Sequence, residues 1–417
     1  MNLILFSASY PYVRGGESNF LGHEVRYLLK DFDRVIVVPE KCVGQVFADH
    51  ADAEIDISYA KCLDSQSFPG LFRLGISSKI FRRGLAEKNF PRFSFSAWRR
   101  LIAFSGKAEF TRRWVLNWLR EKNVKEKDCV FYTYWFDHAA AGIGFLKEQF
   151  PDIKLITRAH GYDIYEEQYY TPPFWPCRNS ALPFIDRIFS ASEAGSQYLS
   201  SRYPKYSNRY ETSLLGVSDP GFVTQPSVDG VFRIASCSMI RPEKRIELLH
   251  KSILHAARLR PQQKIEWFHF GNGVSREQMQ KTADEQLPSN AKAYFPGYSD
   301  LEGLMKYYRD KPFDAFVNVS KTEGTPVSIM EAISCGIPVL ATAVGGNKEI
   351  VSAENGILLS ENPIVDEVAS AFFQLIDNPE IAQAKRQGSR SVWQLKYNAD
   401  HNFPLFSQEL RSIRETE

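Results

Sequence analysis

The chain has 417 residues, more than one ordinary domain needs, so two domains are expected. Apolar residues make up 44% of it and charged residues 24%, the balance of a soluble globular protein. No apolar run reaches the length that spans a bilayer, and the short run at residues 3–6 reads as a strand because no basic residue precedes it. Six scattered cysteines without a C-x-x-C pair argue for reduced thiols in a cytosolic protein and against a zinc site.

The net charge of +2 is unevenly distributed along the chain. Residues 73–122 hold thirteen Lys and Arg against three acids, a charge of +10, and Phe and Trp are interleaved with them. Basic and aromatic side chains together suit an anionic membrane surface or a lipid-linked phosphate. The alternative is a solvated basic face above core aromatics. No nucleic-acid motif accompanies the charge, so nucleic acid is not an expected partner.

Hydrophobic periodicity predicts alternating strands and helices in the first half of the chain. Strands are expected at 3–7, 35–39, 129–132, 154–157 and 187–191. Helices are expected at 18–30, 138–150 and 194–202, with irregular and then helical structure over 60–125.

A turn-rich stretch at 216–230 has the composition of an interdomain crossing, and the α/β pattern restarts after it. Strands are expected at 232–236, 265–270 and 293–295, and helices at 246–259, 277–286, 301–308, 366–377 and 379–395. This order predicts a second α/β domain.

The most specific motif lies between two strands of this second domain. Phe313 to Val319 reads as a buried strand, and Glu323-Gly324-Thr325-Pro326-Val327-Ser328-Ile329-Met330-Glu331 follows it. Thr325 suits a helix N-cap, Pro326 the first helical position and Gly336 the C-terminal cap. The first carboxylate therefore falls in the loop at the strand's carboxyl end, where parallel sheets bind ligands, and Glu331 falls on the second helical turn.

This string, with Ala332, Gly336, Pro338 and the Gly345-Gly346 pair after it, resembles the E-x7-E signature of the retaining GT4 glycosyltransferases. The resemblance implies the GT-B fold, an α/β architecture of two Rossmann-like domains that face each other across a cleft. It implies an N-terminal, acceptor-side domain over 1–212, with 393–417 crossing back to it. The nucleotide-sugar domain would then span 213–392.

The leaving diphosphate of such a reaction needs positive charge, backbone N–H groups or a metal. The segment from Ser238 to Arg245 resembles the family's phosphate-binding segment, in which an arginine precedes a lysine by five positions. Lys244 fits the lysine, but Met239 holds the place of the arginine. Arg241 or Arg245 is expected to supply the second charge. The alternative is a basic surface turn that opens a helix.

The resemblance also implies the roles of the two glutamates. Glu323 would hydrogen-bond hydroxyls of the transferred sugar, and Glu331 would bind the ribose hydroxyls. Gly324, Thr325 and Pro326 would bring backbone amides to the phosphates. Gly271 and Gly297, at two further strand ends, would flank the nucleobase.

In the first half, Gly15 and Gly16 resemble the family's N-terminal glycine loop, which approaches the donor phosphate; an ordinary turn is the alternative. The segment Arg158-Ala159-His160-Gly161-Tyr162-Asp163 follows a strand. A lone histidine is more often structural, but this strand-end position makes His160 a candidate for shaping the active centre. Arg158 and Asp163 are expected to pair with one another or to touch ligand.

The resemblance thus implies a retaining glycosyltransferase of polysaccharide biosynthesis, which moves a hexose-type sugar from a UDP- or GDP-linked donor to a saccharide acceptor that is lipid-linked. Catalysis is assigned to His160, Lys244 and Glu323. No D-x-D metal-binding pair stands at a plausible strand end, so no metal or other cofactor is expected. The predicted location is cytoplasmic, peripheral at the inner face of the cell membrane through residues 73–122. The alternatives are a nucleotide-sugar epimerase of the same fold and a non-catalytic nucleotide-sugar-binding module.

Overall fold

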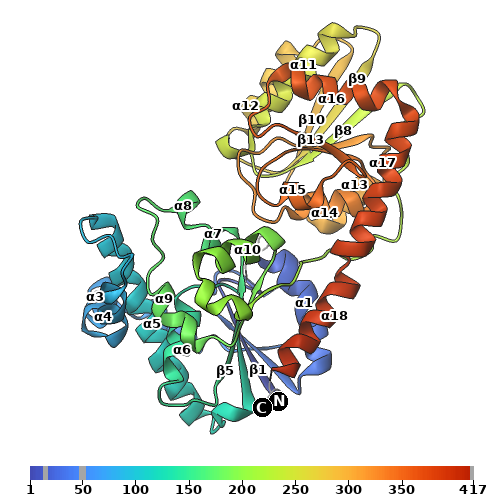
Figure 1. Cartoon of the computed structure of the whole chain (residues 1–417). Coiled ribbons are helices and arrows are strands. Elements are labelled where there is room, and N and C mark those ends of the chain that lie inside the picture. Colours follow the sequence, from blue (N-terminus) through green and yellow to red (C-terminus); the bar gives the residue numbers. More distant parts are fainter. Residues whose placement is uncertain (13–16, 47–52, 414–417) are drawn as a thin grey trace. The chain divides into compact units, whose positions relative to one another are not determined.

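A computed structural model describes residues 1–12, 17–46 and 53–413. The chain divides into two compact units (Figure 1). Unit 1 comprises Met1–Leu215 with His401–Glu417, and unit 2 comprises Gly216–Asp400. Each unit is built on a parallel sheet, so both are α/β units of Rossmann type.

The sheet of unit 1 has the strand order β3-β2-β1-β4-β5-β6-β7 in the described residues, and all its neighbouring strands are parallel. Most of its strands are buried along their whole length because helices cover both faces. The strands are β1 (Asn2–Ser7), β2 (Arg34–Pro39), β3 (Glu54–Ile55), β4 (Cys129–Thr133), β5 (Lys154–Ala159), β6 (Arg187–Ser190) and β7 (Tyr210–Thr212).

Helices α1 and α18 lie on one side of this sheet, and α5 and α6 lie on the other (Figure 1). The helices of unit 1 are α1 (Glu17–Asp31), α2 (Ser58–Asp64), α3 (Phe68–Ser77), α4 (Lys79–Ala86), α5 (Phe95–Glu121), α6 (His138–Leu146), α7 (Gly161–Ile164), α8 (Glu166–Tyr169), α9 (Arg178–Ala181), α10 (Glu193–Arg202) and α18 (Ala399–Ser412).

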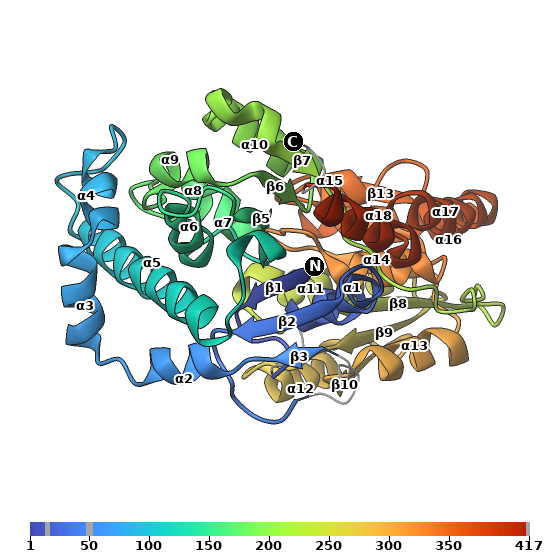
Figure 2. The same cartoon turned by 90° about the horizontal axis from the view of Figure 1, so that it is seen from below.

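Helices α3, α4 and the first turns of α5 extend away from the sheet of unit 1 (Figure 2). Helices α3 and α5 cross at Gly75 and Gly106, whose Cβ positions would lie 2.5 Å and 2.4 Å from backbone carbonyl oxygens of the other helix. Only glycine permits this approach. Several aromatics of the basic stretch are core residues, namely Phe81, Phe90, Phe110, Trp114 and Trp118. The solvated-face alternative therefore holds for that part of the stretch.

The sheet of unit 2 has the order β10-β9-β8-β11-β12-β13, again with parallel neighbours. Its strands are β8 (Val231–Cys237), β9 (Lys264–Phe270), β10 (Ala291–Gly297), β11 (Ala315–Asn318), β12 (Val339–Thr342) and β13 (Gly356–Leu359). Its helices are α11 (Ile246–Leu259), α12 (Arg276–Gln286), α13 (Leu301–Asp310), α14 (Val327–Ser334), α15 (Asn347–Ile350), α16 (Val365–Asp377) and α17 (Pro379–Val392).

The chain passes between the units at two adjacent points. Val217 pairs with Asn398, and the indole Nε1 of Trp393 donates to the carbonyl oxygen of Val217 at 3.1 Å. A Cβ at Gly216 would lie 2.6 Å from the backbone nitrogen of Ala399, so glycine is required at this crossing. Beyond it, α18 packs on the sheet of unit 1, where the ring of Phe406 contacts Tyr132 and Phe189.

Candidate functional site

The candidate donor residues of unit 2 start from two neighbouring strand ends. Strands β8 and β11 are adjacent, and the strand order reverses between them because β9 and β10 lie on the far side of β8. Ligands of parallel α/β sheets bind outside the carboxyl ends of strands at such a switch point. The segment that carries Lys244 follows β8, and the loop that carries Glu323 follows β11.

Glu323 is held at this edge by three donors. Its Oε1 accepts from Lys244 Nζ at 2.6 Å, from Ser320 Oγ at 2.6 Å and from Asn318 Nδ2 at 2.9 Å. The carboxylate side chain is only 9% exposed. Within the described residues its second oxygen, Oε2, makes no hydrogen bond, so one oxygen is oriented by the protein and the other is available to a ligand.

In the segment that carries Lys244, one arginine is bound by backbone carbonyl oxygens and another is exposed to solvent. Arg245 has a left-handed backbone with φ of +51°, and its guanidinium donates to the carbonyl oxygens of Val319, Ser320 and Glu361. These bonds tie the β11 loop in place and engage the Arg245 guanidinium. The Arg241 side chain is 56% exposed, 3.9 Å from the carboxylate of Glu243. Arg241 is therefore the arginine of the segment that is open to an anion.

The start of α14 differs from the prediction. Thr325 is not the N-cap, because Pro326 has an extended backbone (φ −76°, ψ 100°) and takes that position, so the helix begins at Val327. Its C-terminal end follows the prediction, since Gly336 has φ of +70° and its N–H donates to Ile333 O at 3.0 Å. Glu331 lies on the second turn, as expected.

Glu331 is a buried carboxylate, with a residue exposure of 8%. Among the described residues its carboxylate oxygens have no hydrogen-bond or ion-pair partner, and burial raises its pKa to about 7. Buried carboxylates are normally paired, since an unpaired one is costly. An acceptor kept in this condition fits a ligand that supplies hydroxyl donors.

Glycines bring loops close together around these side chains. A Cβ at Gly345 would lie 1.8 Å from the carbonyl oxygen of Glu323, and the N–H of Gly346 donates to Gly324 O at 3.0 Å. The ends of β9 and β10 meet similarly, where the N–H of Gly271 donates to Gly297 O at 2.8 Å and both residues have positive φ. Side chains at these positions would block the approach of backbone to backbone.

In unit 1, Gly15 and Gly16 lie outside the described residues. Glu17, directly after them, is buried and accepts backbone N–H bonds from Ala8 and Ser9 at 2.8 Å and from Tyr10 at 3.1 Å. Burial raises the pKa of Glu17. This carboxylate fixes the loop that leaves β1.

His160 follows β5, as predicted, and lies between aromatic rings. Its ring centroid is 4.7 Å from that of Tyr134 and 4.6 Å from that of Trp135. Burial, and then the charge of Arg158, lower its pKa to about 3, so the ring is neutral at physiological pH. Nε2 lies 3.1 Å from the carbonyl oxygen of Tyr134, which can only accept, so Nε2 carries the proton.

Of the two alternatives for Arg158 and Asp163, the one in which they pair with one another is wrong. Arg158 is fully buried and forms an ion pair with Glu24 at 2.9 Å, while its guanidinium lies 3.8 Å from the ring centroid of Phe406. The Asp163 carboxylate instead accepts the N–H groups of His160 and Phe136. A fully buried arginine needs a charge partner of its own, and α1 supplies it.

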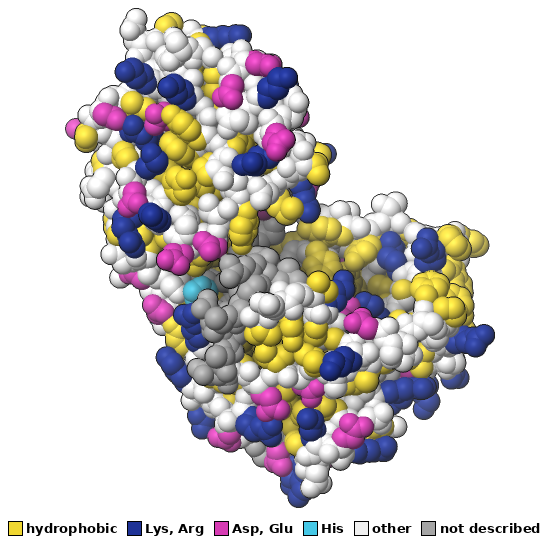
Figure 3. All heavy atoms as spheres, turned by 180° about the vertical axis from the view of Figure 1, so that it is seen from behind, with side chains coloured by type: hydrophobic (Ala, Val, Ile, Leu, Met, Phe, Trp, Pro, Cys, Tyr) yellow, Lys and Arg dark blue, Asp and Glu magenta, His cyan; other side chains and the backbone are white. Residues whose placement is uncertain are grey.

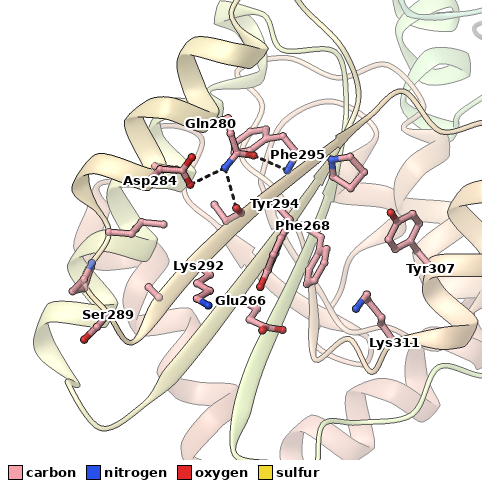
Figure 4. Close-up of a pocket in the computed structure, with 16 residues that line it drawn as sticks. Glu266, Phe268, Gln280, Asp284, Ser289, Lys292, Tyr294, Phe295, Tyr307 and Lys311 are labelled. Carbon is pink, nitrogen blue, oxygen red and sulfur yellow. Dashed lines mark hydrogen bonds between the residues drawn. The ribbon is translucent and has the colours of Figure 1, made fainter.

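A cavity of about 800 Å³ lies elsewhere, alongside β9, β10 and α12 (Figure 4). The amide of Gln280 reaches the edge strand there, donating to Ala293 O at 3.2 Å and accepting from Phe295 N at 3.2 Å. Lys244, Glu323 and Glu331 do not line this cavity. Sequence reasoning missed Asn318 and Ser320, although their position at the end of β11 was the available signal.

The second unit matches the family model Glycosyl transferases group 1 over residues 224–392. The chain is 22% identical over 245 residues to the UDP-N-acetylglucosamine–peptide N-acetylglucosaminyltransferase GtfA subunit of Streptococcus gordonii, covering 55% of this chain and 46% of that one. It is 30% identical over 146 residues to WcaL of Escherichia coli (strain K12), a candidate colanic acid biosynthesis glycosyltransferase, covering 33% and 34%. These matches span less than half the length of either relative.

Among solved structures, the lipopolysaccharide outer core galactosyltransferase WaaB in its apo form has a TM-score of 0.67 at 12% identity, covering 99% of both chains. Two parallel sheets, together with this likeness, show the GT-B fold. Residues 224–392, within unit 2, therefore carry the likeness to the group 1 glycosyl transferases.

Proposed function

We propose that this protein transfers a hexose-type sugar from a UDP- or GDP-linked donor to a saccharide acceptor, with retention of the anomeric configuration. The observation that carries the proposal is the arrangement at the β8–β11 switch point. There Lys244 is held 2.6 Å from Glu323, and Glu331 is buried without a partner among the described residues.

A nucleotide-sugar donor would supply a further anion to Lys244, beside Glu323, and hydrogen-bond donors to Glu331. Its diphosphate brings negative charge to Lys244, which is 24% exposed, and to the nearby Arg241. Its ribose brings two hydroxyl donors to Glu331, and its sugar hydroxyls meet the second oxygen of Glu323. Fixed charges aimed at a leaving group are a large source of rate enhancement.

Retention is proposed to proceed without a covalent intermediate. A two-step route needs a carboxylate nucleophile. Glu323 is instead oriented through one oxygen by Lys244, Ser320 and Asn318, and we assign its carboxylate to binding the sugar hydroxyls. In the proposed step the acceptor oxygen forms a bond to the anomeric carbon on the face from which the diphosphate departs. The acceptor hydroxyl's proton passes to the departing phosphate oxygen, so charge and atoms balance.

The proposed reaction uses no metal, because no D-x-D pair stands at the carboxyl end of a described strand, where ligands of parallel sheets bind. Within the described residues there is no cluster of three or more His, Cys, Asp or Glu placed to hold a metal ion. Charge for the departing diphosphate is assigned to Lys244, Arg241 and the backbone N–H groups at the start of α14.

We further propose a cytoplasmic, peripheral location at the inner face of the membrane. Helix α3 exposes Phe68, Phe72 and Ile76 at 79%, 41% and 42%, on one helical face. Phe93 and Phe95, before α5, are 105% and 78% exposed. Figure 3 shows apolar and basic side chains together at this edge of unit 1. Apolar side chains that enter an interface, flanked by basic residues, suit an anionic bilayer.

The proposed contact surface begins at Phe68, five residues before the basic stretch that starts at Arg73. Its exposed basic residues are Arg73, Lys79, Arg82, Lys88, Arg92 and Arg99. No helix among the described residues is both long enough and apolar enough to cross a membrane. A peripheral contact would bring the enzyme to a lipid-linked acceptor. The relatives named for colanic acid and lipopolysaccharide synthesis support a role in polysaccharide assembly.

The test is incubation of the protein with radiolabelled UDP- and GDP-sugars and a membrane extract. Label that enters the lipid fraction, with the donor's anomeric configuration in the product by NMR, is the expected result. Free interconverted sugar would instead show an epimerase, and nucleotide binding without either product would show a binding module. Inversion at the anomeric carbon would refute retention.

A further inference from the structure

The cavity of about 800 Å³ beside β9, β10 and α12 has no part in the proposed transfer, since Lys244, Glu323 and Glu331 do not line it. Its volume falls within the range of roughly 300–1,000 Å³ that small-molecule sites occupy. In the described residues β10 is the edge strand of the sheet, so the cavity lies along one side of unit 2.

The ring of Tyr294 has an inner and an outer face at this edge. In the sheet register Tyr294 lies opposite Phe268 of β9, and the two ring centroids are 4.6 Å apart with an angle of 18° between the ring planes. Figure 4 shows the two rings side by side. Phe268 is buried, whereas Tyr294 is 37% exposed. Because Phe268 covers the inner face, the outer face of Tyr294 points past the edge of the sheet, where a further ring can stack on it.

Polar side chains lie beside the two stacked rings. Lys292 precedes Tyr294 by two positions, so both point to the same face of β10, and both are exposed. Lys311 directly follows α13, and its Nζ is 5.2 Å from the ring centroid of Phe268. Burial raises the pKa of Tyr294, and the charge and hydrogen bond of Glu266 raise it further, so this carboxylate lies beside the phenol. The rings therefore have hydrogen-bond donors and acceptors around them.

The backbone of the edge strand is closed by side chains of α12. The amide of Gln280 accepts from Phe295 N and donates to Ala293 O, both at 3.2 Å, as a peptide group of a neighbouring strand would. One helical turn earlier, Nη1 of Arg276 donates to Phe295 O at 2.9 Å. These bonds leave the edge unsuited to an added peptide strand, so a small ligand is the better occupant of the cavity.

The charges in the lining of the cavity balance one another. Its carboxylates are those of Glu266 and Asp284, and its ammonium groups are those of Lys292 and Lys311. Glu266 also accepts from Arg233 Nε at 2.8 Å, which fixes the carboxylate. A site for a ligand rich in phosphate or carboxylate groups needs an excess of basic groups, so this lining favours a neutral ligand.

We infer that this cavity is a second saccharide-binding site, separate from the donor site, in which a neutral pyranose stacks on the outer face of Tyr294 and its hydroxyls bond to Lys292 and Glu266. A pyranose carries C–H groups on its ring face and hydroxyls at its rim, so an aromatic face beside mixed donors and acceptors matches both. The inference goes beyond the proposed transfer, because it needs no residue of the donor site. A glycan chain held there would stay on the protein between successive transfers.

The test uses saturation-transfer NMR on the full chain with maltotriose, cellotriose, mannotriose and chitotriose, in the presence of saturating UDP. At least one trisaccharide is expected to receive saturation. Tyr294→Ala should weaken that signal about fivefold, the effect of one lost aromatic contact. Tyr294→Phe, which keeps the ring, should retain most of it. The matched control is Tyr169→Ala, which removes a 47% exposed ring outside the cavity.

A second variant leaves the rings in place. Lys292→Ala changes an exposed side chain and should weaken the signal about threefold, through one lost hydrogen bond from a charged donor. Equal signals for wild type and either variant, or no signal from any trisaccharide, would overturn the site. So would a loss that Tyr169→Ala shares. Calorimetry should give the wild-type affinity for UDP and GDP in Tyr294→Ala, and a weaker affinity would show that the site is not separate from the donor site and overturn the inference.

Discussion

At the switch point of unit 2 the polar side chains include a lysine and two carboxylates, whereas at that of unit 1 a neutral histidine lies among aromatic rings. The topology is shared, since in both sheets the strand order reverses beside the first strand. The difference shows that the fold decides where a ligand can bind, while the residues directly after each strand decide its chemistry. Unit 2 suits a diphosphate with diols, and unit 1 suits an apolar ring face.

The largest expected effect is the loss of turnover when the charge of Lys244 in unit 2 is removed. Lys244→Ala should lower kcat about 10²- to 10³-fold, because it removes a fixed charge from the departing diphosphate. Initial rates with a labelled donor measure this, and Lys251→Ala, an exposed lysine on α11, is the matched control. A near-normal rate in Lys244→Ala would show that Arg241, not Lys244, stabilises the departing diphosphate.

The buried carboxylate of unit 2 should make nucleotide binding depend on pH. Glu331 has a pKa of about 7 in the free protein, and ribose hydroxyls stabilise its ionised form. Affinity for UDP or GDP should therefore rise from about pH 6 to about pH 8 and then level off, as the carboxylate ionises. Glu331→Gln should weaken binding about tenfold and remove this pH dependence.

Calorimetry in buffers of different ionisation enthalpy measures the proton released on binding. Wild-type protein near pH 6 should release a proton, and Glu331→Gln should not. An unchanged affinity in the variant, or a proton release equal to that of wild type, would remove Glu331 from the nucleotide site.

Glu331 should also affect stability. Its pKa is raised from 4.5 to about 7 on folding, so the stability it contributes is present below pH 4.5 and is lost as pH rises through 7. Glu331→Gln should therefore stabilise the ligand-free protein at about pH 8 by at most about 3 kcal/mol and have little effect near pH 4. Urea unfolding at the two pH values tests this, and a variant less stable than wild type at the higher pH would contradict it.

Membrane contact would extend the comparison, because the proposed contact surface of exposed apolar and basic residues lies in unit 1. Flotation with anionic liposomes should fall as salt rises, since screening weakens the basic contribution. Phe72→Ser combined with Phe93→Ser should reduce flotation severalfold, because each loses buried apolar surface. Val274→Ser in unit 2, at a residue 106% exposed, is the control. Flotation that is independent of salt, or absent, would refute the contact.

The smallest expected effect is at His160, whose pKa of about 3 keeps the ring neutral. Its C2-proton chemical shift should stay constant between about pH 5 and pH 8, in contrast to the titration expected at Glu331. NMR of selectively labelled histidine, assigned with His160→Asn, measures it. A midpoint within that range would show that the surrounding aromatic rings do not exclude water from His160.

Most long elements were predictable because their apolar residues repeat with a clear period. Helix α11 spans Ile246–Leu259, as expected, and β2, β4 and β9 agree within one residue at each end. The short strands β3, β7 and β13 were missed, since two to four residues carry little periodic signal and pairing in the sheet creates them. The helix expected to run to Phe150 ends at Leu146, followed by turns rather than a cap glycine.

The candidate site was less completely predictable. The loop and helix positions of Glu323 and Glu331 followed from the strand, turn and helix signals around them. The third and fourth members of the cluster, Ser320 and Asn318, were not found, because hydrogen bonding to Glu323 depends on loop geometry. The partner of Arg158 was not found for a related reason: Glu24 is 134 residues away in the chain, and only the folded sheet brings the two together.

The central claim is that a nucleotide sugar binds at the β8–β11 switch point of unit 2, and a crystal structure with a UDP- or GDP-sugar tests it most directly. The diphosphate is expected beside Lys244, the ribose hydroxyls on Glu331 and the sugar hydroxyls on Glu323. Density for the nucleotide in the cavity beside β10, with Glu331 still unpartnered, would contradict the claim.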